Sequence, residues 1–208
     1  MEFPISPPAQ SPTSANGVRG RTSVVGHYRA ISWRQGLVVL ILLLLDGLSL
    51  GNARASEFDE YAVKAAYLYN FAKYVEWPLG MFTSANAPLL ICIAGDNPFG
   101  DALTTLSGKM IESHPVEIRG LSVTTDLASC HIVFVSRAEQ GRFKTLLAKL
   151  ARQPILTVSD ISDFAQAGGM IGLVEVDQRI HFNINLNATR QARLKLSSQL
   201  LKLATIVE

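Results

Sequence analysis

Cysteine, histidine and the usual catalytic motifs are scarce in this 208-residue sequence, which holds two cysteines and four histidines. The four histidines (His27, His114, His131 and His181) show no metal-ligand spacing. A C-x-x-C redox motif, a G-x-S-x-G elbow and a G-x-G-x-x-G phosphate loop are all absent. Cys130 and His131 are neighbours at the start of a predicted strand, so their side chains should point to opposite faces. The sequence therefore predicts no catalytic residue, no metal and no cofactor.

A charge excess of one sign is also missing from the body of the chain. The first 55 residues hold five of the 19 basic and two of the 17 acidic residues, which leaves 14 basic and 15 acidic residues beyond them. The remainder thus has a net charge of −1. Nucleic-acid binding requires a basic surface, so the composition excludes it.

No apolar run is long enough to span a membrane. The unbroken run covers residues 36–45 and follows Arg29 and Arg34, and the small residues Ala53 and Ala55 come after it. A basic flank, a short apolar core and a small-x-small site are typical of a secretory signal peptide, whereas a spanning helix needs about 20 apolar residues. We predict a leader over residues 1–55, cleaved after Ala55 and leaving no membrane span. An uncleaved anchor is the alternative.

The exported part, residues 56–208, alternates apolar strands with amphipathic helices. Strands are predicted at 89–94, 115–119, 132–135 and 155–158, and helices at 57–75, 99–106, 139–151, 161–167 and 188–206, the last capped by Asn187. Parallel strands need such crossovers. The sequence predicts a single three-layer α/β domain: a mostly parallel sheet flanked by helices, with a C-terminal β-hairpin and a final helix.

The hairpin is predicted from two β-rich runs, 170–176 and 179–186, joined by a tight turn at Asp177 and Gln178. In the second run Ile180, Phe182, Ile184 and Leu186 alternate with His181, Asn183, Asn185 and Asn187. One face should therefore be buried and the other solvated. A solvated face near the end of a sheet is a candidate surface for a partner.

The two cysteines, Cys92 and Cys130, both lie in or beside predicted buried strands. An exported protein with two cysteines is expected to join them. In a 2-1-3-4-5 strand order the first and third strands are neighbours, which brings the two Cα atoms within bridging distance. Two buried free thiols are the alternative.

Several motifs occur in an order that resembles the YfiR/HmsC family of exported regulators. They are KAAYLYNFAKYVEWP at 64–78, GDNPFG at 95–100, CHIVFVS at 130–136, LTVSD at 156–160, GGMI at 168–171, FNIN at 182–185 and SSQLL at 197–201. The resemblance implies a periplasmic α/β domain without catalytic activity. It also implies a partner, the periplasmic part of an inner-membrane diguanylate cyclase, whose inhibition lowers cyclic di-GMP, exopolysaccharide and biofilm formation. A disulfide at Cys92 and Cys130 fits the family pattern, whereas a second cysteine pair of some relatives is missing.

The candidate partner-binding residues lie on the hairpin and the Gly-Gly turn before it: Phe164, Met170, Leu173, Glu175, His181 and Asn183. Ordinary core packing of Phe164, Met170 and Leu173 is the alternative interpretation. A second hypothesis is a small-ligand sensor, with Asp96, Asn97, Ser136 and Asp160 lining the crevice at the carboxyl ends of the strands. The apolar, tyrosine-rich helix 57–75 either packs on the sheet or supports a homodimer.

Overall fold

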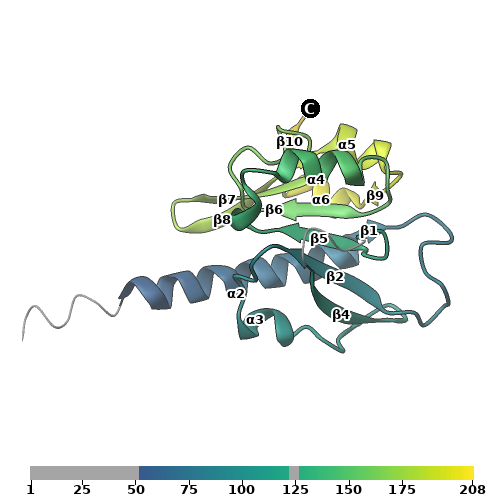
Figure 1. Cartoon of the computed structure of the whole chain (residues 1–208), viewed down its shortest axis with the longest axis horizontal. Coiled ribbons are helices and arrows are strands. Elements are labelled where there is room, and N and C mark those ends of the chain that lie inside the picture. Colours follow the sequence, from purple (N-terminus) through teal and green to yellow (C-terminus); the bar gives the residue numbers. More distant parts are fainter. Residues whose placement is uncertain (1–51, 122–126) are drawn as a thin grey trace, which may run out of the picture. The chain divides into compact units, whose positions relative to one another are not determined.

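The computed structural model describes residues 52–121 and 127–208 (Figure 1). The predicted leader lies outside the described residues except for Asn52–Ala55, which form the first turn of helix α2 (Asn52–Tyr74). The cleavage site after Ala55 is not tested by this arrangement and stays a prediction.

An eight-stranded sheet forms the centre of the domain. Its strands are β2 (Leu89–Ala94), β3 (Met110–Ile111), β4 (His114–Leu121), β5 (Ile132–Val135), β6 (Leu156–Ser159), β7 (Ile171–Val176), β8 (Arg179–Asn185) and β10 (Thr205–Val207). The spatial order is β10-β8-β7-β6-β5-β2-β4-β3, and only β7–β8 and β3–β4 pair antiparallel. The predicted mostly parallel sheet is confirmed, and its first five predicted strands take the 2-1-3-4-5 order in which Cys92 and Cys130 lie on neighbouring strands.

Helices cover both faces of the sheet because the central strands are apolar on both sides. In β2, Leu89, Ile91 and Ile93 belong to a core cluster with Leu68 and Phe71 of α2. The alternate positions Leu90, Cys92 and Ala94 belong to a second cluster, together with buried residues of α4 (Phe143–Leu150). Strand side chains point alternately to the two faces, so two separate cores are the signature of a three-layer domain.

Shorter elements complete the layers. They are α3 (Asp101–Thr104), the 3-10 turn η2 (Arg137–Glu139), α5 (Leu186–Gln191), α6 (Ser198–Lys202) and a small antiparallel pair of β1 (Val75–Glu76) with β9 (Lys195–Leu196). Helix α2 ends at Tyr74, four residues before Pro78. The helix predicted at 57–75 is thus confirmed in position, and its buried residues Leu68 and Phe71 support packing on the sheet.

The predicted helix at 161–167 is wrong, because this segment forms successive turns. Ser159 does act as a cap, and its Oγ accepts a hydrogen bond from the N–H of Ile161 at 3.0 Å. Asp163 then adopts a φ of 55°, which interrupts a right-handed helix, and Gly168 has a φ of 102°. The glycine therefore ends a single turn, as expected of its backbone freedom, but no regular helix precedes it.

The predicted final helix is present only in part, because the segment 188–206 does not form one continuous helix. The segment divides into α5, β9, α6 and β10, and Arg193 takes a φ of 60° between the first two. Two separate caps start the short helices: Asn185 Oδ1 accepts from the N–H of Ala188 at 2.9 Å, and Ser197 Oγ from that of Leu200 at 3.2 Å. Asn185 is thus the cap in place of Asn187. Local capping competes with helix continuation in such serine and asparagine positions.

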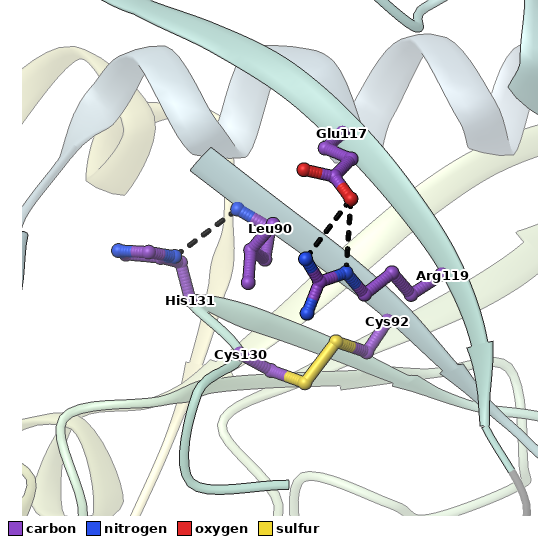
Figure 2. Close-up of a disulfide and its surroundings, with 6 residues drawn as sticks. All are labelled: Leu90, Cys92, Glu117, Arg119, Cys130 and His131. Atoms are coloured by element: carbon purple, nitrogen blue, oxygen red, sulfur yellow. Dashed lines mark hydrogen bonds and ion pairs between the residues drawn. A yellow bond between two sulfur atoms is a disulfide. The ribbon is translucent and has the colours of Figure 1, made fainter. Parts of the chain in front are cut away.

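The disulfide between Cys92 and Cys130 joins β2 to the segment just before β5 (Figure 2). The two Cα atoms are 6.0 Å apart, and both side chains are fully buried. The expected bridge is therefore present, at the neighbouring strands that the strand order requires. His131 makes a different contact: its Nδ1 accepts a hydrogen bond from the N–H of Leu90 at 3.1 Å.

Candidate partner-binding surface

The hairpin β7–β8 extends beyond the strands on either side of it (Figure 1). Its turn residues Asp177 and Gln178 have φ values of 50° and 59°, as a two-residue type I′ turn requires. Strand β7 pairs with β6 only at Ile171 and Gly172, and β8 pairs with β10 only over residues 183–185. Residues 173–182, here named the hairpin arm, therefore form a two-stranded ribbon without further strand partners among the described residues.

One face of the hairpin arm is anchored to α2 by aromatic side chains. The ring of Phe182 lies 5.6 Å from that of Tyr67 and 5.2 Å from that of Phe71, both in edge-to-face geometry. The Tyr67 hydroxyl also donates a hydrogen bond to the carbonyl of Ile180 at 2.9 Å. An isolated two-stranded hairpin is marginally stable in water. The contacts with α2 therefore keep the arm in place.

The opposite face of the arm is solvated. Val174 and Val176 are 36% and 48% exposed, and His181, which pairs with Val174, is exposed as well. The predicted alternation of β8 is confirmed over most of the strand, with Phe182 and Ile184 buried. Asn185 departs from it, because its side chain is buried and donates a hydrogen bond to the carbonyl of Ala165 at 2.9 Å.

Three of the six candidate partner-binding residues lie in the core. Phe164, Met170 and Leu173 are at most 5% exposed, so a partner cannot reach them in this conformation. Phe164 packs against Phe143 and over Gly169, where a Cβ atom would lie only 2.2 Å from the Phe164 ring. The core interpretation of these residues is the one that the structure supports. Glu175 and His181 are exposed and Asn183 is partly exposed.

A groove of about 800 Å³ lies between α2, the hairpin arm and the end of α6. Its walls come from Glu60, Val63 and Tyr67 of α2, from Glu175 and residues 178–182 of the arm, and from Leu203. Sequence reasoning missed Val63 and Leu203, which are 42% and 74% exposed. Val63 lies in the helix predicted at 57–75, and Leu203 lies in the helix predicted at 188–206, which the structure divides into shorter elements.

The residues of the alternative ligand site follow the carboxyl ends of β2, β5 and β6, and the chain's own charged groups surround Asp160. Asp160 Oδ2 accepts from the Tyr61 hydroxyl at 2.9 Å and from Lys64 Nζ at 2.5 Å, and Arg137 Nε lies 3.2 Å away. Lys64 is 1% exposed and also pairs with Glu60. A buried ammonium is tolerated only with such partners. Burial next to Asp160 raises the pKa of Tyr61, which keeps its hydroxyl a donor.

The other three residues of that site show no common ligand geometry. Ser136 is buried, and its Oγ has no hydrogen-bond partner among the described residues. Asp96 and Asn97 are exposed, and Asn97 Oδ1 accepts from the N–H of Phe99 at 3.0 Å. The asparagine thus serves as a turn cap. Asp160 already forms ion pairs with Lys64 and Arg137. Ligand binding at these four residues stays a prediction.

An aromatic cluster at the opposite end of the sheet was not predicted. The Phe82 ring stacks on His114 at 3.7 Å and on His131 at 4.3 Å, and Trp77 lies edge-on to His131. Burial, followed by the neighbouring His114, lowers the pKa of His131 to about 4. His131 is therefore neutral at physiological pH, as its accepted hydrogen bond from Leu90 requires.

Within residues 52–121 and 127–208, no three His, Cys, Asp or Glu side chains group as metal ligands. The same part of the chain contains no helix with the length and apolar character needed to cross a bilayer.

The family model described as YfiR/HmsC-like matches residues 61–205, from near the middle of α2 to the start of β10. The chain belongs to this family, and the resemblance seen in the sequence motifs is confirmed. The family is one of regulatory, non-catalytic periplasmic proteins.

Proposed function

We propose that this protein is a periplasmic inhibitor of an inner-membrane diguanylate cyclase. It binds the periplasmic part of the cyclase and so lowers cyclic di-GMP, exopolysaccharide output and biofilm formation. The observation that carries the proposal is the family match over residues 61–205, which covers almost every described element. The leader, residues 1–55, directs export and is removed after Ala55, which takes the first four residues of α2 with it.

Inhibition by binding sets a thermodynamic requirement. The protein shifts the cyclase toward an inactive conformation only if it binds that conformation more tightly than the active one. A tenfold difference in affinity corresponds to about 1.4 kcal/mol. The inhibitor needs no catalytic group for this, only a surface whose contacts differ between the two states of the cyclase.

The hairpin arm and the groove beside it form the proposed contact surface. Glu175 and His181 supply polar groups there, Asn183 lies directly after the arm, and Val174 and Val176 supply exposed apolar area on the solvated face. Clusters of exposed apolar side chains rimmed by polar ones mark interaction sites. A near-neutral body adds little electrostatic steering, so apolar contact and hydrogen bonding should account for most of the affinity.

The test is the cyclic di-GMP level of the host. Deleting the gene should raise cyclic di-GMP severalfold, and the wild-type gene supplied in trans should restore the original level. A V174R/V176R variant should restore it poorly, whereas L79R, which changes an exposed residue outside the arm, should restore it fully. An unchanged level after deletion, in a host whose cyclase is intact, would contradict the proposal.

A further inference from the structure

We infer that the outer edge of β8, over residues 179–182, accepts an extended segment of the partner as an added β-strand. The inference rests on the proposed function and specifies how the partner is bound. The proposed hydrogen bonds are made by the backbone of the arm, not by its side chains.

Within the described residues, no strand of the chain pairs with this part of β8 on the side away from β7. Strand β10 runs parallel to β8 and starts at Thr205, which lies opposite Asn183. The residues before Thr205 belong to α6 and the turn at Leu203. Strand β10 therefore does not extend alongside residues 179–182 of β8. Over residues 179–182, β8 therefore has no strand partner among the described residues on the side away from β7.

The hydrogen-bonding direction of β8 places backbone groups at this edge. The N–H of Asn185 donates to the carbonyl of Met170, so Asn185 points toward β7. Successive strand residues point to alternate edges, and Ile180 and Phe182 therefore direct their N–H and C=O groups away from β7. The Tyr67 hydroxyl reaches the Ile180 carbonyl from that side, which agrees with this assignment.

The groove follows the same edge. Five consecutive residues, 178–182, line it. Side chains of a strand alternate between faces, so a lining of consecutive residues means that the backbone edge itself forms the wall. Val63 and Tyr67 of α2 and Leu203 also line the groove. A strand of four residues spans about 13 Å at the usual rise, and its side chains on the α2 face would meet Val63 and Leu203.

An extended peptide fits this edge better than other occupants. Helices use their backbone groups internally, and an acyl chain carries no acceptor for the N–H groups of Ile180 and Phe182. Added strands gain affinity from main-chain hydrogen bonds and specificity from alternate side chains. The charges at the groove are nearly balanced, since Glu60 pairs with Lys64, and the arm contributes one acidic and one basic residue to the lining, Glu175 and Arg179. The complementary segment is thus uncharged and apolar at alternate positions.

Amide hydrogen exchange tests this contact directly. The protein is labelled for NMR and titrated with the purified periplasmic domain of the host's membrane-bound diguanylate cyclase. We expect the amides of Ile180 and Phe182 to exchange at least tenfold more slowly in the complex. Met110 and Ile111, on the edge strand at the far side of the sheet, provide the internal control and should not change.

Two variants give an independent readout of the groove. L203E and V63E place a carboxylate in the path of the added strand and should each weaken the complex at least tenfold, whereas L79E should bind like the wild type. The added strand is overturned if a complex forms but the amides of Ile180 and Phe182 are not protected and L203E binds with unaltered affinity. The proposed function would stand in that case. Failure of any complex to form overturns both.

Discussion

The central strands and the hairpin arm belong to one sheet but differ in burial and in strand pairing. Every residue of β2, β5 and β6 is buried, and each strand is paired on both sides. In the arm, burial falls from Ile171 to Val176 along β7, and neither outer edge of residues 173–182 is covered by another strand of the described chain. The centre is specified by apolar contact on two faces, whereas the arm depends on one face and on α2. Perturbing each region should therefore affect different properties.

Removing the disulfide should have the largest effect on stability. The Cys92–Cys130 bridge spans a sequence separation of 38, and closing a loop of that size contributes about 4 kcal/mol in the chain-entropy description. A C92A/C130A variant should lose roughly this much in urea unfolding monitored by circular dichroism. A loss below about 1 kcal/mol would mean that the apolar contacts of the central strands suffice without the bridge.

Lowering the pH should destabilise the central region through His131. Its pKa is about 4 in the folded protein and 6.5 when unperturbed, so the unfolded chain binds more protons between these values. The contribution is complete above about pH 6.5 and is lost as the pH falls toward 4, by up to about 3 kcal/mol. Unfolding measured from pH 7 to 4 should show this loss, and H131Q should reduce it. An unchanged pH profile in H131Q would contradict the assignment.

Adding a side chain at Gly169, at the junction between the centre and the arm, should lower the stability of the protein. An alanine Cβ would lie 2.2 Å from the buried Phe164 ring, so G169A should cost about 2 kcal/mol through overpacking. The matched control is G120A, whose Cβ would meet no atom within 4 Å. In an F164L background G169A should cost less, because the smaller side chain removes the clash. Equal costs in both backgrounds would exclude the ring as the cause.

The smallest expected effect comes from loosening the arm. Y67F removes the hydrogen bond from the Tyr67 hydroxyl to the Ile180 carbonyl, which contributes about 1 kcal/mol. The loss should appear as faster amide exchange confined to residues 173–182, with little change in the exchange of β2. Faster exchange spread evenly over the sheet would show that the arm and the centre unfold as one unit.

The centre could be predicted from the sequence because its signal is local. The predicted strands at 89–94 and 132–135 match β2 and β5 residue for residue, since an apolar run between turn residues has one interpretation in an alternating α/β pattern. The hairpin turn at Asp177 and Gln178 could also be predicted, because two β-rich runs separated by two residues indicate a hairpin. The disulfide followed from the strand order.

The remaining features depend on contacts that a sequence does not display. The leucine spacing after residue 188 resembles a helix stripe, yet caps at Asn185 and Ser197 divide the segment and leave Leu203 exposed. Phe164, Met170 and Leu173 look like surface candidates beside a turn, but the fold turns them inward. The groove joins residues more than 100 positions apart. Lys64 was not recognised as the partner of Asp160, because a lysine on an apolar helix carries no sign of what it meets.

The central claim, inhibition through the hairpin arm, is tested most directly on the cyclase itself. Membrane vesicles that expose the periplasmic side of the cyclase, and contain GTP inside, are incubated with the purified protein while cyclic di-GMP formation is measured. The wild-type protein should inhibit formation in a concentration-dependent and saturable manner, and V174R/V176R should require at least tenfold more protein. Cyclic di-GMP formation that stays constant at saturating wild-type protein would contradict the account.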